Sequence, residues 1–167
     1  SWLAEIKSIP DDKCISPKQI NITIATRNNG SGHSIYIQIP RIKNPIPLFI
    51  AFRALGIISD KDICRYIILD IKKENMKKML FALKASIVDA EKYNTQETAL
   101  QFIVNNAMFT PINMGEEEGK QKKKEFTQNV LNKDLYPHCR NIKEKIYFMG
   151  YMTNKLLRTK FNWRNVD

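Results

Sequence analysis

Two trios of isoleucines in strict alternation constrain the fold of this chain more than any other feature. The trios are Ile20, Ile22 and Ile24, then Ile35, Ile37 and Ile39. Spacing of β-branched residues at every second position places each trio on one face of a strand. Between them, residues 27–32 are rich in asparagine and glycine, which tolerate the positive φ of a tight turn. We therefore predict an antiparallel β-hairpin with Arg27 at its exposed tip.

The chain changes from strand patterns to helix patterns after this hairpin. Three prolines within residues 40–47 stop the second strand. The apolar segment 48–55 follows and predicts a deeply packed helix, which Gly56 is well placed to end in a left-handed cap. The one charged residue of that helix is Arg53, and we predict that this arginine anchors helix packing or a salt bridge.

Capping residues and apolar repeats predict the next helices. Ser59 precedes an acidic first turn and is a typical N-cap. Asn94 or Thr95 can cap a later helix, and Asn94 and Glu97 have the spacing of a capping box. Between these caps, one amphipathic helix is indicated by apolar residues at three- and four-residue steps, namely Met76, Met79, Leu80, Leu83 and Ile87.

Two further helices are expected toward the C-terminus. One starts in the charged segment after Gly115, where acids and lysines pair at i and i+4, and Pro137 ends it. The last runs over residues 142–161. Strands first and helices later favour the α+β class. We predict a single domain, with an antiparallel β-hairpin or small sheet over 1–46 and a bundle of five or six helices over 47–167.

Charge and cysteine content narrow the class of protein. The formal net charge is +10, which attracts nucleic acid or anionic membranes, although a solvated lysine-rich surface explains it as well. The three cysteines, Cys14, Cys64 and Cys139, lie far apart, which argues against a disulfide framework or a zinc site and favours a reducing compartment. No apolar run reaches the roughly 20 residues of a membrane span, so no membrane association is predicted.

Residue patterns that carry chemistry are weak in this sequence. Residues 30–32, Gly-Ser-Gly, lack the frame of a phosphate-binding loop. Neither His33 nor His138 has a second histidine at metal-ligand spacing, and Cys64 is interpreted as a small buried apolar residue. The clustered acids fit helix starts better than a magnesium site. We therefore predict no catalytic residue, no cofactor-binding residue and no metal ligand in this chain.

The candidate contact residues are therefore all basic. They fall near the hairpin and in one charged helix start, as Arg27, Arg41, Lys43, Lys120, Lys122, Lys123 and Lys124. A solvated helix face is the alternative for the lysine run. Contacts of this kind with DNA are nonspecific and salt-sensitive, with dissociation constants on the order of 10⁻⁴ to 10⁻⁶ M.

Several segments, in order, resemble one protein family. Residues 47–58, PLFIAFRALGII, resemble the Phe-Arg-Ala-Leu-Gly segment of the second-largest subunits of multisubunit DNA-directed RNA polymerases. Residues 148–157, FMGYMTNKLL, resemble the helix that closes the lobe domain in the eukaryotic and archaeal branch of that family. Between them, residues 97–100 and 135–138 fall in the expected order.

The resemblance implies a noncatalytic lobe that lines the DNA cleft and supports DNA-templated RNA synthesis. In that family the nucleotidyltransferase centre and its Mg²⁺ lie elsewhere, so the lobe itself holds no cofactor. The implied partners are the other polymerase subunits, template DNA held weakly, and an initiation factor of the general factor IIF type. We expect a fragment of a larger chain, located in the nucleus of a cellular eukaryote, or in the host cytoplasm or virion of a large DNA virus.

Two alternatives remain open at this stage. A freestanding basic nucleic-acid-binding module fits the charge and the lack of a visible active site. An enzyme whose site is dispersed along the chain requires a deep pocket with converging acid and base groups.

Overall fold

An antiparallel sheet forms the N-terminal part of the protein, as the alternating isoleucines predict. The structure is a computed structural model that describes residues 2–6, 20–26, 32–69 and 73–161. The sheet has four strands in the order β1-β2-β3-β4. The strands are β1 (Trp2–Ile6), β2 (Ile20–Thr26), β3 (His33–Gln38) and β4 (Ile46–Pro47).

The predicted hairpin is the central pair of this sheet. Ile22 lies opposite Ile37 and Ile24 lies opposite Ile35, so the two trios share one face, where these four side chains are buried. The tip with Arg27 lies outside the described residues. The outer strand β1 and the two-residue β4 are additions to the predicted hairpin, which thus becomes a small sheet.

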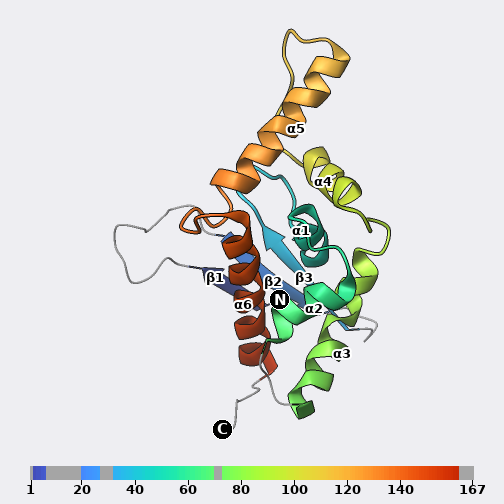
Figure 1. Ribbon diagram of the computed structural model, residues 1–167, viewed down its shortest axis with the longest axis vertical. Coiled ribbons are helices and arrows are strands. Elements are labelled where there is room, and N and C mark those ends of the chain that lie inside the picture. The colour runs from blue at the N-terminus through green and yellow to red at the C-terminus, as the bar shows by residue number, and fades with distance from the viewer. Residues whose placement is uncertain (1, 7–19, 27–31, 70–72, 162–167) are drawn as a thin grey trace.

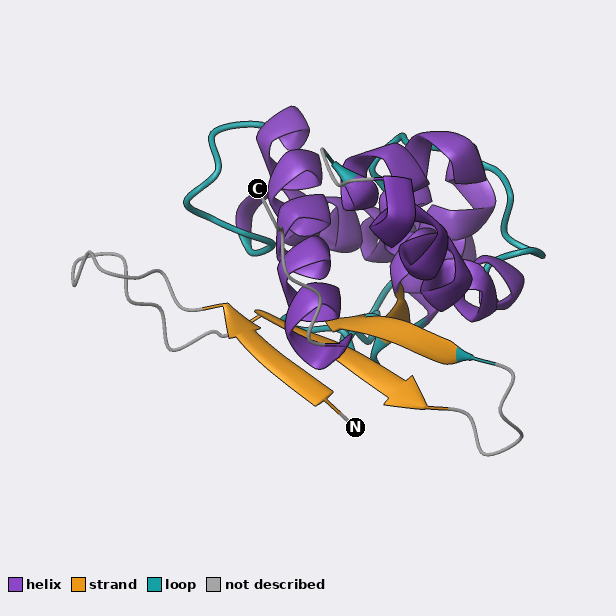
Figure 2. Cartoon of the chain, turned by 90° about the horizontal axis from the view of Figure 1, so that it is seen from below, coloured by secondary structure: helices purple, strands orange, loops and turns teal. Residues whose placement is uncertain are grey.

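Six helices follow in the described part of the chain and gather on one face of the sheet (Figure 2). They are α1 (Leu48–Ala54), α2 (Asp60–Ile68), α3 (Lys73–Asp89), α4 (Gln96–Asn105), α5 (Glu116–Lys133) and α6 (Ile142–Phe161). The predicted α+β class is confirmed, and α6 has the predicted bounds. No helix among the described residues is long and apolar enough to cross a membrane.

Helix α1 is the centre of the helical layer. All seven of its residues are buried, and it contacts α3, α4 and the strands β3 and β4. Gly56 follows it with φ +111, and its amide donates to the Arg53 carbonyl oxygen at 3.0 Å. This left-handed conformation suits glycine because it has no Cβ to clash with the backbone, so the predicted glycine cap is confirmed.

The helix caps agree with the sequence in one case and differ in another. Ser59 caps α2, because its Oγ accepts a hydrogen bond from the Asp62 amide at 3.1 Å. Thr95, one of the two predicted candidates, caps α4 and forms a capping box with Thr98, so only the predicted pairing of Asn94 with Glu97 is wrong. The Thr98 hydroxyl accepts from the Thr95 amide at 3.2 Å, which is the role that a carboxylate usually takes at this position.

Two helices differ from their predicted extents or faces. Helix α5 ends at Lys133, before Pro137, because the chain there turns inward and buries Leu135 and Tyr136. In α3, Met79 and Leu83 are buried as predicted, but Met76 and Leu80 are 36% and 42% exposed. The apolar stripe of α3 is therefore wider than the surface that covers it.

Candidate interaction surfaces

The segment with the strongest family resemblance locks α6 against α2. Gly150 of α6 lies directly against the main chain of Tyr66, and a Cβ added at Gly150 would come within 2.8 Å of the Tyr66 carbonyl carbon. Four residues on, the buried Asn154 donates its side-chain amide to the carbonyl oxygens of Ile67 at 2.8 Å and Ile68 at 3.1 Å. Those carbonyls are at the C-terminus of α2, where they have no partner within that helix.

The second motif segment places a buried arginine between three elements. The Arg53 guanidinium donates to the carbonyl oxygens of Ile58 at 2.8 Å, Ala90 at 2.7 Å and Tyr93 at 3.3 Å. It also forms an ion pair with Asp60 in the first turn of α2. The planar fork thereby ties α1 to α2 and to the end of α3. The predicted anchoring role of Arg53 is confirmed.

The third motif segment, residues 135–138, is held by a buried lysine. Lys145 of α6 is 2% exposed and donates its ammonium to the carbonyl oxygens of Leu135 and, at 3.2 Å, Tyr136. Burial lowers the pKa of Lys145. The ring of His138 packs edge-on against Phe148 with centroids 4.6 Å apart, and burial lowers the pKa of this histidine, helped by the nearby Lys145. These contacts hold the connection between α5 and α6.

The basic residues near the sheet form a turn beside α5. Arg41 has φ +63, and its Nε and Nη2 donate to one carboxylate oxygen of Asp134 at 3.1 and 2.5 Å. Lys43 is exposed, and its amide donates to the Asn106 carbonyl oxygen at 2.7 Å. Arg41 is thus partly engaged within the protein, whereas the Lys43 ammonium faces solvent. Arg27, the third of this predicted group, lies outside the described residues.

The lysine run of α5 is largely balanced by acids, as the predicted pairing at i and i+4 requires. Lys120 lies 3.4 Å from Glu116 and 4.0 Å from Glu117, and Lys122 lies 3.7 Å from Glu125. Lys123 is partly buried, whereas Lys124 is exposed. Over its whole length α5 has five lysines and four glutamates, a net charge of only +1 (5 − 4).

The predicted contact residues do not form a single patch. Figure 1 shows α5 pointing away from the sheet along the longest axis of the molecule, with its N-terminal half outermost. Asp134, which holds Arg41, follows the inner end of that helix. Ten to fourteen residues separate Asp134 from Lys124 and Lys120, so about 15 to 21 Å of helix lies between the two basic groups.

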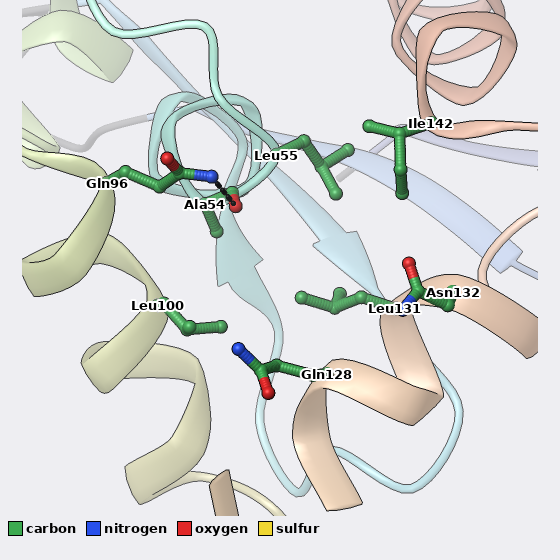
Figure 3. A pocket seen from close by; sticks show the side chains of 8 residues that line it. All are labelled: Ala54, Leu55, Gln96, Leu100, Gln128, Leu131, Asn132 and Ile142. Carbon is green, nitrogen blue, oxygen red and sulfur yellow. Dashed lines mark hydrogen bonds between the residues drawn. The ribbon is translucent and has the colours of Figure 1, made fainter. Parts of the chain in front are cut away.

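A groove between α1, α4 and α5 was not predicted from the sequence. Its volume is about 400 Å³, and Figure 3 shows side chains from these elements and from the start of α6 pointing into it. The groove is lined by both amides and apolar groups. The amides are Gln96, Gln128 and Asn132, and the larger apolar residues are Leu55, Leu100, Leu131 and Ile142. The Gln96 amide donates to the Ala54 carbonyl oxygen at 3.2 Å. The sequence gives no local signal for this groove, because its residues come from four elements.

A second surface missed by the sequence lies on the outer side of α6. Tyr147 and Tyr151 are about half exposed, and the Lys155 ammonium lies 5.5 Å from the centre of the Tyr151 ring. The spacing of four residues between these positions is visible in the sequence and could have indicated them. No cluster of histidine, cysteine, aspartate and glutamate able to hold a metal ion occurs within the described part of the chain.

The fold and these surfaces define the class of protein. It is an α+β domain whose motif residues join helices, and whose grooves and exposed aromatic and basic side chains lie on its surface. The family model described as RNA polymerase Rpb2, domain 2 matches residues 9–167. The chain belongs to this family. The resemblance seen in the sequence motifs is confirmed.

Individual relatives agree with this assignment. The chain is similar to DNA-directed RNA polymerase II subunit RPB2 of Schizosaccharomyces pombe, with 30% identity over 100% of the chain and 14% of the relative. It is 31% identical to the protein of the same name from Encephalitozoon cuniculi, over 98% of the chain and 14% of the relative. DNA-directed RNA polymerase subunit 2 of Acanthamoeba polyphaga mimivirus is 27% identical over 94% of the chain and 13% of that relative. The chain therefore spans about one seventh of the length of the curated relatives that it matches.

Proposed function

We propose that this chain acts as the noncatalytic lobe of the second-largest subunit of a DNA-directed RNA polymerase, where it lines the DNA cleft during DNA-templated RNA synthesis. The observation that carries the proposal is the use made of the family's motif residues. Arg53, Gly150 and Asn154 are all buried, and each joins helices that are distant in the chain. Residues with this role support a scaffold and not a reaction centre.

The proposed partners follow from the same assignment. The other polymerase subunits hold the domain in place, and the Mg²⁺ of the parent enzyme is bound outside this chain. Template DNA binds the domain weakly, mainly through Lys43 and Lys124. Both lysines are exposed, and neither forms an ion pair among the described residues. An initiation factor of the general factor IIF type docks on the outer face. The protein works in the nucleus of a cellular eukaryote, or in the host cytoplasm or virion of a large DNA virus.

DNA contact is tested by fluorescence anisotropy with a short duplex at several salt concentrations. We expect dissociation constants on the order of 10⁻⁴ to 10⁻⁶ M that rise with salt, since phosphate contacts release counterions. The double variant Lys43→Gln, Lys124→Gln should bind several times more weakly and show a shallower salt dependence. Lys92→Gln, a change at an exposed lysine in the turn after α3, is the matched control. Affinity that is independent of salt would overturn the DNA contact.

The noncatalytic role is tested in the complete polymerase. With the same double variant in the full subunit, the rate of nucleotide addition on a pre-annealed primer and template should stay within about twofold of the parent, a difference below about 0.4 kcal/mol. Binding of DNA and of a factor of the IIF type is measured alongside. If the rate of nucleotide addition fell as much as DNA binding did while the enzyme stayed assembled, the noncatalytic assignment would be wrong.

A further inference from the structure

The angle between α2 and α3 contains an apolar groove. Its volume is about 740 Å³, and it is lined from α2 by Cys64 and Ile68, from the end of that helix by Leu69, and from α3 by Met76 and Leu80. On each helix the two apolar lining residues are four positions apart, so they form two short rows that face each other. Burial raises the pKa of the Cys64 thiol to about 11, so the floor of the groove is uncharged at neutral pH.

Large apolar side chains continue from this groove over the outer surface of α3. Leu69, Met76 and Leu80 are 36% to 42% exposed, and beyond them Phe81 is 68% and Val88 is 54% exposed. Single exposed apolar residues are common, but several large ones that line or lie near an apolar groove mark a place where another molecule binds. The five side chains belong to one stretch of chain from the end of α2 to the end of α3.

Basic side chains stand along both rims of the groove. Lys61 and Arg65 line it from α2, and Lys77 and Lys84 are exposed on α3 beside Leu80 and Phe81. The two acids of α2 are engaged by arginines, Asp60 by the buried Arg53 and Asp62 by Arg65 at 3.6 Å. Among the described side chains, the rims thus carry an excess of positive charge around an apolar floor.

This combination fits one kind of partner. Rows of apolar residues four positions apart on two helices accept a third helix that presents apolar residues at i, i+3, i+4 and i+7. The basic rims favour carboxylates on the polar flanks of such a helix, and repel a basic one. A bare polyanion such as DNA would satisfy the rims but would leave Leu80, Met76 and the groove floor without apolar contacts.

We propose that the groove between α2 and α3 binds an amphipathic helix with acidic flanks from a partner protein. This goes beyond the proposed function, because it names the chemistry of the partner at a face that none of the predicted DNA-contact residues shares. The partner helix lays its apolar side between Ile68 and Leu80 and pairs its carboxylates with Lys61 and Lys77. The occupant is a polypeptide, whereas Lys43 and Lys124 serve DNA.

The test uses synthetic helical peptides of about 18 residues, five turns, and the whole 167-residue chain. One peptide has an apolar Leu/Phe face with glutamates on its flanks, a second has lysines in place of the glutamates, and a third has the acidic composition in scrambled order. Binding is measured by fluorescence anisotropy and by the NMR signals of the methionine methyl groups. We expect the acidic amphipathic peptide to bind at least tenfold more tightly than the other two, and to shift the Met76 signal but not that of Met108.

Two matched double variants locate the site. Leu80→Ser with Phe81→Ser removes exposed apolar groups and should weaken binding of the acidic peptide at least tenfold. Met108→Ser with Ile112→Ser removes apolar groups of greater mean exposure in the connection before α5 and should leave binding unchanged. Lys77→Glu with Lys84→Glu should reverse the preference, so that the lysine-flanked peptide binds more tightly. Far-UV circular dichroism confirms that each variant is folded.

Several results would overturn the proposal. The scrambled peptide could bind as tightly as the amphipathic one, which would mean that charge alone drives peptide binding. The Leu80→Ser, Phe81→Ser variant could retain full affinity. Alternatively, the chain could form dimers that this variant abolishes, in which case a second copy is the occupant. Each of these outcomes is independent of the DNA measurements above, so failure of this proposal and failure of the proposed function can be told apart.

Discussion

Gly150 packs its α carbon against the main-chain carbonyl group of Tyr66, and this contact sets how closely α6 approaches α2. The approach places Asn154, one turn further along α6, within hydrogen-bond distance of the last carbonyl groups of α2. Close contact and capping are thus two parts of one junction. The junction explains why a glycine and an asparagine stand in a helix whose other buried residues are mainly apolar.

Gly150→Ala should lower the free energy of unfolding. Alanine favours a helix over glycine by about 1 kcal/mol. Its Cβ, however, would meet backbone atoms of Tyr66 that cannot move without shifting α2, and overpacking of this kind costs about 1 to 3 kcal/mol or more. We expect a net loss, measured by urea unfolding. Gly115→Ala is the control, since nothing lies within 4 Å of an added Cβ there, and should cost less than about 1 kcal/mol. Equal effects of the two changes would contradict this account of the junction.

Asn154→Ala should destabilise the protein through the end of α2. The change removes both hydrogen bonds to the Ile67 and Ile68 carbonyl oxygens, and a buried acceptor left without a partner costs about 1 to 3 kcal/mol. Asn129→Ala, at an exposed position within α5, should have little effect. Amide hydrogen exchange is the sharper measurement: exchange should speed up at the C-terminal turn of α2 in the Asn154 variant before any global change.

Arg53 and Asp60 should contribute very unequally to stability. Arg53→Met leaves the carbonyl groups of Ile58, Ala90 and Tyr93 without their donor, and we expect a loss of about 3 kcal/mol or more. Asp60 is about half exposed, so Asp60→Asn should cost about 1 kcal/mol or less. Arg53→Lys should not restore stability, since an ammonium cannot reach all four partners. Thermal unfolding of the three variants tests this order, and similar losses for Arg53→Met and Asp60→Asn would refute it.

Cys64 should make stability depend on pH in the alkaline range. Its folded pKa of about 11 lies above the ordinary value of 9.0, because burial disfavours the thiolate and Asp60 lies nearby. Between these values the unfolded chain loses the proton and the folded chain keeps it, so stability present below pH 9 declines as the pH rises toward 11. The difference in unfolding free energy between the parent and Cys64→Ala, measured from pH 8 to pH 11, isolates this effect. A difference that does not vary with pH would count against it.

Local patterns in the sequence predict much of this fold. The isoleucine alternation gives the central strands, Ser59 gives the start of α2, and Gly56 gives the end of α1. These features depend on neighbours in the chain. Strand β1 was missed because Trp2–Ile6 has no alternation, and α3 was predicted too deep because periodicity shows that a stripe exists but not how wide a surface covers it.

The candidate surfaces were harder to predict, because they depend on contacts between distant residues. The pairing of Arg41 with Asp134 spans 93 positions, and the sequence contains nothing that links the two. The balance of charges within α5 was visible in the sequence as i and i+4 spacing. Which lysines are actually paired became clear only from the side-chain contacts of Glu116 and Glu125 in the structure. The grooves bring together helices whose relative placement no local pattern encodes.

The bond from Asn154 to Ile67 has a consequence for biosynthesis. It joins positions 87 residues apart, so a nascent chain released from the ribosome only as far as α5 lacks the group that completes α2. Until α6 is translated, the carbonyl groups of Ile67 and Ile68 therefore lack the side-chain donor that satisfies them in the folded protein.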